Sequence, residues 1–402
     1  MKRYVIIGSG PAGVTGAEAI RHHNPTGEVL ILSLERSPFY YRTDLDLLVG
    51  GRMTLEQMFV HPPEFYKDRQ IDVRLEQMVV AVHPERNSVR LSTGEEIEYD
   101  ALLIAAGAKP IVGNWPGVDT EGVVTVRTLE DAQALVGRAS VSRRAVVVGG
   151  GLVGLILAEA LHRRGLELTL LVREPQLWWP VLDGPASDIL RRKLEAEGNT
   201  VRTEEEVVEF VGEQALRAVK TSKGNVLEVD LAVVAIGVRP NVEFLRDTAV
   251  KVDRGVLVNE YLQSSIPNIY AAGDVAQAFD LVQHAHRVNT SWANAENQGN
   301  IAGTNMATSK AITFTGGIAA NTEIVYGIPF TALGLTNPLD GSYQVLATEQ
   351  KEVNIYRKLV TKDGRLVGAL LVGRSRQVAK LQRLIEEGVD ITATGEQLLA
   401  EA

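Results

Sequence analysis

The feature that most constrains this 402-residue chain is one pattern that occurs twice. In each copy an apolar run leads into a G-x-G-x-x-G turn and then into a segment of helical character, at residues 3–20 and 145–161. A second β-rich run follows each copy, and the next acidic side chain after it is Glu35 or Glu174. A strand, a glycine turn, a helix and an acid about 20 residues further on are the fingerprint of a dinucleotide-binding βαβ unit. The pattern therefore predicts two such units.

The residue types in these turns have physical reasons. The first glycine allows a sharp turn, the second lets the backbone approach a pyrophosphate, and the third lets helix and strand pack closely. The helix N-terminus then offers free N–H groups and a positive dipole to the phosphates. We therefore expect phosphate contacts at the glycines and the helix starts of both copies, namely Gly8, Gly10, Pro11, Ala12 and Gly13 in the first and Gly149, Gly151, Leu152, Val153 and Gly154 in the second.

The duplication extends further along the chain. Residues 99–107 and 230–237 are apolar runs that end in small residues and a glycine, Gly107 and Gly237. Each run is interpreted either as a buried parallel strand with a terminal turn or as a strand whose end passes close to a bound dinucleotide. The repeat favours the second interpretation.

The order of these segments predicts three domains. A first dinucleotide domain covers 1–114 and resumes at 244–315, and a second is inserted at 115–243. Beyond residue 315 the periodicity changes to short strands and a closing helix, which indicates a C-terminal α+β domain over 316–402. The expected strands are 322–326, 330–333, 344–347, 353–359 and 366–372, with a hairpin turn at 362–364 and a helix at 377–387.

Composition excludes several classes of function. The chain has no cysteine, which removes disulfides, cysteine-ligated zinc, iron–sulfur clusters and thiolate chemistry. A net charge of −9 disfavours a nucleic-acid partner. The longest apolar stretch, 145–158, is too short for a membrane span, and the apolar run after Met1 is too short for an export signal, so we expect a cytoplasmic protein.

The sequence resembles the two-dinucleotide flavoprotein family of pyridine-nucleotide-dependent reductases, in the branch of rubredoxin reductases, ferredoxin reductases and the flavin portion of nitrite reductase large subunits. Residues 105–110 match its A-T-G-x-x-P turn with Ala106 in place of threonine, 264–274 match its second FAD motif, and 292–306 match the helix that points at the flavin. The resemblance implies an α/β fold with two Rossmann-like domains, as in glutathione reductase, and an additional C-terminal α+β domain. It also implies FAD and NADH or NADPH as cofactors.

The resemblance carries site residues over to this chain. Besides the first glycine turn, the residues expected to contact FAD are Glu35, Arg36, Arg42, Val80, Ala106, Gly107, Lys109, Gly273, Asp274, Trp292 and Ala295. Asp274 would hold the ribityl chain. Besides the second glycine turn, the residues expected to contact the nicotinamide nucleotide are Arg173, Glu174 and Gly237.

Two departures from the family bear on the chemistry. The lysine that the family places beside the flavin, five residues after Arg42, is Leu47 here, and its glutamate partner is Ile156. Losing one partner alone would leave an unpaired buried charge at a cost of about 3–5 kcal/mol, so the pair is interpreted as replaced as a unit. The replacement raises the question of whether a nicotinamide delivers its hydride in the ordinary way.

The choice of nicotinamide is open at this stage. The family's NADH-type acid falls on Val172, with Arg173 and Glu174 directly behind it. An arginine there can face the 2′-phosphate of NADPH, whereas Glu174 can accept a hydrogen bond from a ribose hydroxyl.

Two smaller features have competing interpretations. His284 and His286 are weak candidates for proton donation or metal binding, but a polar loop is the simpler interpretation and no metal site is predicted. Trp178 and Trp179 could form an exposed platform for a carrier protein, but apolar packing at a domain edge is favoured.

The favoured function is an FAD-dependent NAD(P)H oxidoreductase. Because the missing cysteines exclude the family's disulfide reductases, electrons must pass to an external acceptor, such as a rubredoxin- or ferredoxin-like carrier, a quinone or oxygen. The alternative is an FAD-binding electron-transfer or structural subunit of a larger complex with a degenerate nicotinamide site. The tail resembles a family domain that often forms dimers, so a homodimer is also among the expected associations.

Overall fold

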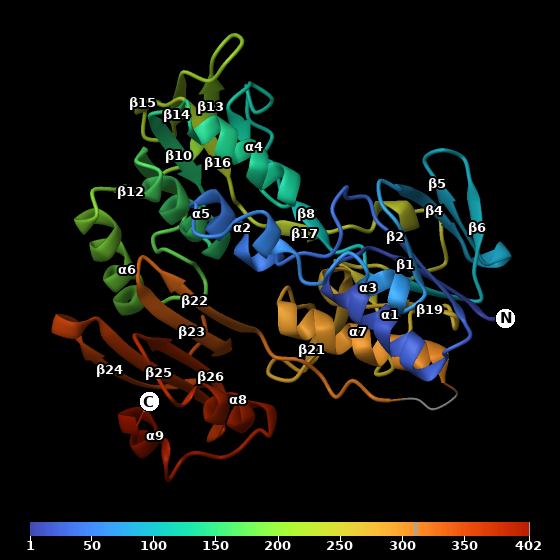
Figure 1. Ribbon diagram of the computed structural model, residues 1–402. Helices are drawn as coiled ribbons and strands as arrows, with labels where there is room; N and C mark the ends of the chain where they lie inside the picture. Colours follow the sequence, from blue (N-terminus) through green and yellow to red (C-terminus); the bar gives the residue numbers. More distant parts are fainter. Residues whose placement is uncertain (309–311, 402) are drawn as a thin grey trace. The chain divides into compact units, whose positions relative to one another are not determined.

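Each of the two glycine turns connects a strand of a parallel sheet to a helix that packs on that sheet (Figure 1). The computed structural model describes residues 1–308 and 312–401. Contacts divide it into two units, one of residues 1–43, 55–109 and 239–318 and the other of 44–54, 110–238 and 319–402. The second unit combines the inserted and C-terminal segments. The division into three domains with the boundaries given above stays a prediction.

The first unit is built on a five-stranded parallel sheet of order β19-β7-β1-β2-β3. Buried valine, leucine and isoleucine side chains fill its strands, because a parallel sheet is covered on both faces. The strands are β1 (Arg3–Ile7), β2 (Glu28–Leu32), β3 (Ile71–Arg74), β7 (Ala101–Ile104) and β19 (Ile269–Ala271), and the helices are α1 (Pro11–His23), α3 (Phe65–Asp68) and α7 (Trp292–Ala307).

Helices α1 and α7 run side by side in this unit (Figure 1). Their contact needs glycine, since a Cβ on Gly299 would lie 2.3 Å from the carbonyl oxygen of Ala12, and one on Gly303 would lie 2.3 Å from that of Gly16. The first unit also contains an antiparallel sheet of β4 (Val79–His83), β5 (Ser88–Leu91) and β6 (Glu96–Glu98). A mixed sheet comprises β18 (Val256–Leu257), β20 (Ala276–Asp280) and β21 (Ala285–Val288), in which β18 pairs with β20 in parallel and β20 with β21 antiparallel.

The second unit repeats the parallel arrangement with the order β12-β11-β10-β16-β9. Its strands are β9 (Val123–Val124), β10 (Arg144–Val148), β11 (Glu167–Val172), β12 (Thr200–Thr203) and β16 (Leu231–Val234), and its helices are α2 (Leu45–Val49), α4 (Leu129–Ala139), α5 (Leu152–Arg163) and α6 (Gly184–Ala196). A small antiparallel sheet comprises β13 (Val207–Val211), β14 (Ala218–Thr221) and β15 (Val226–Glu228). The remaining short strands, β8 (Ala108–Pro110) and β17 (Val238–Pro240), pair with each other at the ends of the inserted segment.

The C-terminal part of the second unit is an antiparallel sheet of order β22-β23-β26-β25-β24, with α8 and α9 packed on it (Figure 1). The predicted tail of five strands and a helix is confirmed, and residues 363–364 form the expected hairpin turn with positive φ angles of 50° and 77°. The elements are β22 (Ala320–Val325), β23 (Ile328–Gly334), β24 (Gln344–Gln350), β25 (Ile355–Lys362), β26 (Arg365–Val372), α8 (Val378–Glu386) and α9 (Gly395–Glu401).

The predicted fold class is confirmed, with parallel sheets at both fingerprints and an antiparallel C-terminal sheet. Among the helices of the described residues, none combines the length and apolar character that a bilayer crossing requires.

Candidate functional site

The two glycine turns have almost the same geometry. Gly8 has a φ of 110° and Gly149 a φ of 114°, which L side chains rarely adopt. A Cβ on either would also lie 2.2–2.3 Å from a carbonyl oxygen, that of Ala105 for Gly8 and that of Ala235 for Gly149. The first glycine of each fingerprint is therefore required by the fold itself, as is the third, whose Cβ would lie 2.0–2.1 Å from the carbonyl oxygen of the first.

The second glycine of each turn is different. Gly10 and Gly151 have φ values of −80° and −74°, which any residue adopts, and a Cβ on either would meet no atom of the described residues within 4 Å. No described neighbour therefore requires glycine here. Each residue caps the N-terminus of a helix, where free N–H groups favour a phosphate. The open space at Gly10 and Gly151 suits the pyrophosphate of a dinucleotide at each turn.

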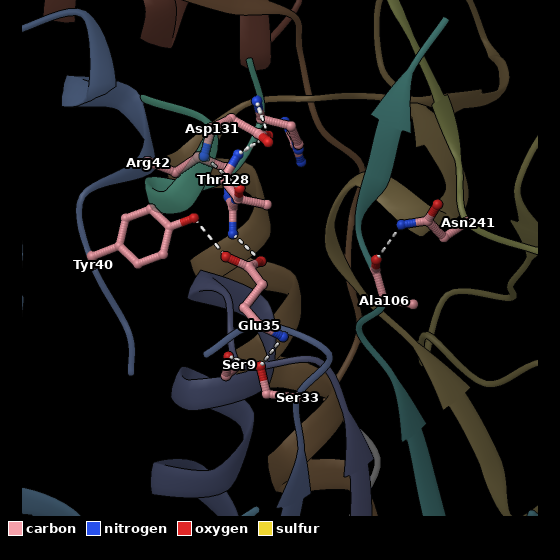
Figure 2. A network of polar contacts seen from close by, with 10 residues as sticks. Ser9, Ser33, Glu35, Tyr40, Arg42, Ala106, Thr128, Asp131 and Asn241 are labelled. Atoms are coloured by element: carbon pink, nitrogen blue, oxygen red, sulfur yellow. Dashed lines mark hydrogen bonds and ion pairs between the residues drawn. The ribbon is translucent and has the colours of Figure 1, made fainter. Parts of the chain in front are cut away.

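A carboxylate lies just beyond β2, at the position where a ribose would need one. Glu35 accepts a hydrogen bond of 2.6 Å from the Tyr40 hydroxyl and forms an ion pair of 2.5 Å with Arg42 (Figure 2). The Ser9 and Ser33 hydroxyls are 2.7 Å apart and link the glycine turn to the end of β2. Both side chains of the ion pair are about one-fifth exposed, so Glu35 keeps oxygen lone pairs for a ligand hydroxyl.

Arg42 is held in its charged form. Burial acts to lower its pKa, but Tyr40, Glu35 and Asp274 outweigh that effect and raise the pKa of Arg42 above its ordinary value. Asp274 belongs to the turn 273–275, which is fixed because the backbone N–H of Gly273 donates to the Gln298 side chain over 2.8 Å. The predicted FAD residues Glu35, Arg42 and Asp274 thus interact within one unit.

Small residues surround this turn. A Cβ on Gly273 would lie 3.0 Å from the Cβ of Ala12 and 3.4 Å from that of Ala295. The start of α1, the 273–275 turn and the first turn of α7 therefore meet closely. Trp292 begins α7 and stacks on Phe39 with ring centroids 5.3 Å apart.

The 105–110 turn is braced by the segment after β17. The Asn241 side chain donates to the carbonyl oxygen of Ala106 over 2.8 Å (Figure 2). The backbone N–H of Asn241 donates to the carbonyl oxygen of Gly107 over 2.9 Å. Lys109 forms an ion pair of 2.6 Å with Glu243. Its ammonium group is therefore occupied by a carboxylate of this protein.

Two further predicted FAD residues are set apart from this network. Arg36 is strongly exposed and pairs with Glu76 at 2.9 Å. Val80 is half-buried on β4 and has an apolar side chain, which can join no hydrogen-bonded cluster. The Arg36 guanidinium is therefore paired with a carboxylate of this protein.

The predicted nicotinamide side has an unusual strand end. Val172 is only 1 % exposed, because its side chain packs over Gly150. Arg173 is largely exposed and forms an ion pair of 2.7 Å with Glu174, which is about one-quarter exposed. Arg173 and Glu174 are therefore exposed charges that a ribose or a phosphate would meet at this strand end. Gly237 lies at the end of β16 with a φ of 119°.

The two aliphatic replacements lie on neighbouring helices of the second unit. Leu47 is half-buried on α2 and Ile156 is half-buried on α5, two helices in contact. One position before Leu47, burial together with the carboxylates of Glu323, Asp44 and Glu159 raises the pKa of Asp46 to about 7. Leu47 thus follows a carboxylate in the sequence, at the position where the resemblance implies a lysine.

The histidine candidates lie apart from the cluster around Glu35. His284 and His286 are exposed at the β20–β21 hairpin, where both rings contact Phe279. His286 also lines an open cavity of about 740 Å³ with Lys251 and Phe314. Within residues 1–308 and 312–401, no cluster of three or more His, Asp or Glu side chains could hold a metal ion.

Trp178 and Trp179 differ in exposure. Trp178 is 5 % exposed and packs near Phe330, whereas Trp179 is 38 % exposed. Apolar packing, the favoured interpretation, therefore holds for Trp178.

Sequence reasoning missed three supporting residues. Tyr40 holds Glu35, Gln298 holds Gly273, and Asn241 braces the 105–110 turn. Gln298 lies inside the 292–306 motif and Tyr40 lies two residues before Arg42, but only the folded chain pairs each residue with its partner.

Comparison with known proteins gives a consistent result. Residues 2–299 match the family model described as pyridine nucleotide-disulphide oxidoreductase, and 322–389 match that of the rubredoxin NAD+ reductase C-terminal domain. An NADH oxidase of Methanocaldococcus jannaschii is 31% identical, with 95% of this chain and 90% of that protein covered. The NAD(P)H nitrite reductase of Bacillus subtilis is 28% identical, with 98% of this chain covered.

The chain spans only 48% of the length of that nitrite reductase. Among solved structures, the ferredoxin reductase from Rhodopseudomonas palustris has a TM-score of 0.86 and 25% identity, with 93% of this chain and 92% of that chain covered. The resemblance inferred from the motifs is confirmed.

Proposed function

Because this chain belongs to the pyridine nucleotide-disulphide oxidoreductase family, we propose that it passes electrons from NADH or NADPH through FAD to an external acceptor. It is an oxidoreductase of the flavoprotein type, with FAD and NAD(P)H as cofactors. The observation that carries the proposal is the open space at Gly10 and Gly151, each at a helix N-terminus of a dinucleotide fold. When bound, FAD would supply the redox chemistry, namely hydride uptake from the nicotinamide and electron release to the acceptor.

The residues around Glu35 would hold FAD. The helix α1 N-terminus would bind its pyrophosphate, and Glu35 would accept hydrogen bonds from the adenosine ribose while Tyr40 and Arg42 fix its carboxylate. Asp274 would bind a hydroxyl of the ribityl chain. Their mutual contacts preorganise these groups before the cofactor arrives.

The turn 149–154 would bind the nicotinamide nucleotide. The α5 N-terminus would face the pyrophosphate, and Arg173 and Glu174 would offer a cation for a 2′-phosphate and an acceptor for a ribose hydroxyl. Both nucleotides are therefore proposed as substrates, with Arg173 favouring NADPH and Glu174 favouring NADH.

The acceptor is proposed to be external because the chain has no cysteine. A redox-active disulfide, a sulfenate or a protein persulfide cannot form on it. The rubredoxin-reductase type of C-terminal domain favours a small electron-carrier protein over a quinone or oxygen.

A second candidate function follows from Leu47 and Ile156. Without the lysine–glutamate pair, the chain could serve as an FAD-binding electron-transfer subunit that receives its electrons from a partner. The chain's match to about half of the nitrite reductase length is compatible with a role inside a larger assembly.

One anaerobic experiment separates these functions. The FAD-loaded protein is mixed with NADH and, separately, with NADPH in a stopped-flow instrument, and the flavin absorbance is followed. Bleaching within seconds at millimolar nucleotide supports the reductase. No bleaching with either nucleotide, while dithionite still reduces the flavin, would support the subunit instead. A protein that does not bind FAD would contradict both.

A further inference from the structure

One loop of the second unit contains the strand end of the predicted nicotinamide site and contacts the glycine turn of that site. Residues 173–183, here called the nicotinamide loop, run from the end of β11 to the start of α6. Arg173 and Glu174 begin this loop. At its middle, the backbone N–H of Trp178 donates to the carbonyl oxygen of Gly150, over 2.6 Å, inside the glycine turn. The position of this loop therefore affects the turn that would hold the pyrophosphate.

The far end of the loop is held by buried charges from the C-terminal sheet. The Lys358 ammonium lies 2.8 Å from Asp183 Oδ2, and the Tyr356 hydroxyl donates to the same oxygen over 2.7 Å. Lys358 is about 5% exposed and Asp183 about 16% exposed. The other carboxylate oxygen, Oδ1, caps α6 by accepting from the Ala186 N–H. Asp183 thus joins the loop, α6 and β25.

Three further contacts connect the loop to β23 and to the segment that follows it. The Thr336 hydroxyl donates to the carbonyl oxygen of Val181 over 2.7 Å, and the Asn337 amide donates to that of Leu182 over 3.3 Å. The ring of Trp178 lies 6.4 Å from that of the fully buried Phe330 on β23. The C-terminal sheet therefore supports the loop from Trp178 to Asp183.

The charges make this support specific. A carboxylate as buried as Asp183 needs a charged partner, because leaving it unpaired costs several kcal/mol. Lys358 on β25 is this charged partner. Burial most strongly, and then the hydrogen bond to Asp183, raise the pKa of Tyr356, so its hydroxyl stays protonated and donates. If Lys358 is removed, the loop is expected to move Asp183 toward water.

We propose that Lys358 and Tyr356 are positioning residues for the nicotinamide nucleotide, which act through Asp183 and the nicotinamide loop on the 149–154 turn. The C-terminal sheet is then a working part of the nicotinamide site. This inference rests on the proposed binding of NAD(P)H at that turn. The contacts Lys358–Asp183–loop and Trp178–Gly150 carry it.

The test compares Lys358→Met and Tyr356→Phe with Lys362→Met. Lys362 is an exposed lysine on the same strand, so its substitution controls for the loss of a positive charge. For each variant, anaerobic flavin reduction is measured against NAD(P)H concentration, which separates the apparent Kd from the limiting rate. FAD content, dithionite reduction and the thermal unfolding midpoint are recorded in parallel.

We expect Lys358→Met to raise the apparent Kd about tenfold, equivalent to about 1.4 kcal/mol, with a limiting rate within about twofold of the wild type. Tyr356→Phe should raise the Kd less, and Lys362→Met should leave it unchanged. An unchanged Kd in a Lys358→Met protein that retains FAD would overturn the proposal. The same holds if Lys358→Met lowers the unfolding midpoint but leaves the Kd unchanged. If Lys358→Met does not fold, Tyr356→Phe decides.

A binding measurement separates this inference from the proposed function. ADP-ribose contains the pyrophosphate and adenosine parts of the nucleotide but cannot reduce flavin. If the wild type is not bleached by NAD(P)H, the proposed reductase fails. Weaker ADP-ribose binding by Lys358→Met in calorimetry would still support the positioning role, and equal binding would refute it.

Discussion

Arg42 lies 2.5 Å from Glu35, and this ion pair places a carboxylate and a guanidinium together at the end of β2. Tyr40 donates to the other oxygen of the same carboxylate. Because each group fixes its neighbour, neither needs to be reoriented when a ligand hydroxyl arrives. The pair belongs to the part of the first unit where the start of α1 and Asp274 also lie.

Substituting Arg42 should weaken FAD binding. Arg42→Met removes the charged partner of the partly buried Glu35 carboxylate but keeps the hydrogen bond from Tyr40. We expect this loss to weaken FAD binding by about 1.5–3 kcal/mol, or about 10- to 100-fold in FAD affinity. Titration of the apoprotein with FAD, followed by flavin fluorescence, measures the change. Arg144→Met is the control, since it removes an exposed ion pair, with Glu228, in the second unit. Equal FAD affinity in Arg42→Met and the wild type would remove Arg42 from the proposed site.

The second glycines should separate the two cofactors. Gly10→Ala should fold and lose FAD, whereas Gly151→Ala should fold, retain FAD and lose reduction by NAD(P)H. The reason is the same for both variants, because each new methyl group would enter space that only a ligand uses. FAD content and anaerobic reduction report the two effects. Gly137→Ala in α4 is the matched control, as its Cβ would also meet no atom among the described residues; it should bind normally and gain about 0.5–1 kcal/mol of helix stability. Normal nucleotide binding by Gly151→Ala would contradict the assignment of the turn.

Arg173 and Glu174 should move the nucleotide preference in opposite directions. Arg173→Ala removes the exposed cation and should lower kcat/KM for NADPH about tenfold with little change for NADH. Glu174→Ala should lower kcat/KM for NADH, because the ribose hydroxyl loses its acceptor, and should favour NADPH because a repulsive charge is gone. Steady-state kinetics with an artificial acceptor, at one fixed pH, measures both ratios. If both variants change NADH and NADPH equally, neither residue contacts the 2′ position.

Asp46 should make stability depend on pH. Burial and then the neighbouring carboxylates raise the pKa of Asp46 in the folded state to about 7. Between about pH 4 and pH 7 the folded state therefore keeps a proton that the unfolded chain has released. Stability is therefore lost as the pH rises toward 7, and the loss levels off above it. Asp46→Asn removes this cost and should stabilise the protein by about 2 kcal/mol at pH 8, with a smaller gain at pH 5.

Thermal unfolding at the two pH values tests this prediction. Asp188→Asn is the control, because Asp188 is exposed on α6. A gain for Asp46→Asn that is equal at pH 5 and pH 8 would show that Asp46 does not titrate in this range.

Much of the site was predictable because it depends on local conformation. The positions of Gly8, Gly13, Gly149 and Gly154 follow from a strand–turn–helix unit, whose carbonyl oxygens leave no room for a side chain. The tail strands were likewise visible as alternating apolar runs. Their ends shifted, since β25 begins at Ile355, after the left-handed Asn354, and not at residue 353.

Other contacts could not be predicted because they join residues distant in sequence. Asp183 and Lys358 are 175 residues apart, and neither residue type in its local context predicts a buried ion pair. The segment 44–54 begins two residues after Arg42, yet its contacts place it with the second unit, where the charges of Glu159 and Glu323 act on Asp46. Such contacts follow from the packing of whole sheets and helices, which no short motif describes.

The amino-acid sequence alone thus determined the family and the two dinucleotide units, because these depend on glycine turns and on short motifs of neighbouring residues. The tertiary structure alone decided which charges are paired. In the folded chain Val172 is buried, Lys109 pairs with Glu243, and the nicotinamide loop is bonded to the C-terminal sheet through Asp183. The physical reason is that charge pairing depends on distance and burial in space, whereas a turn depends only on the conformation of neighbouring residues.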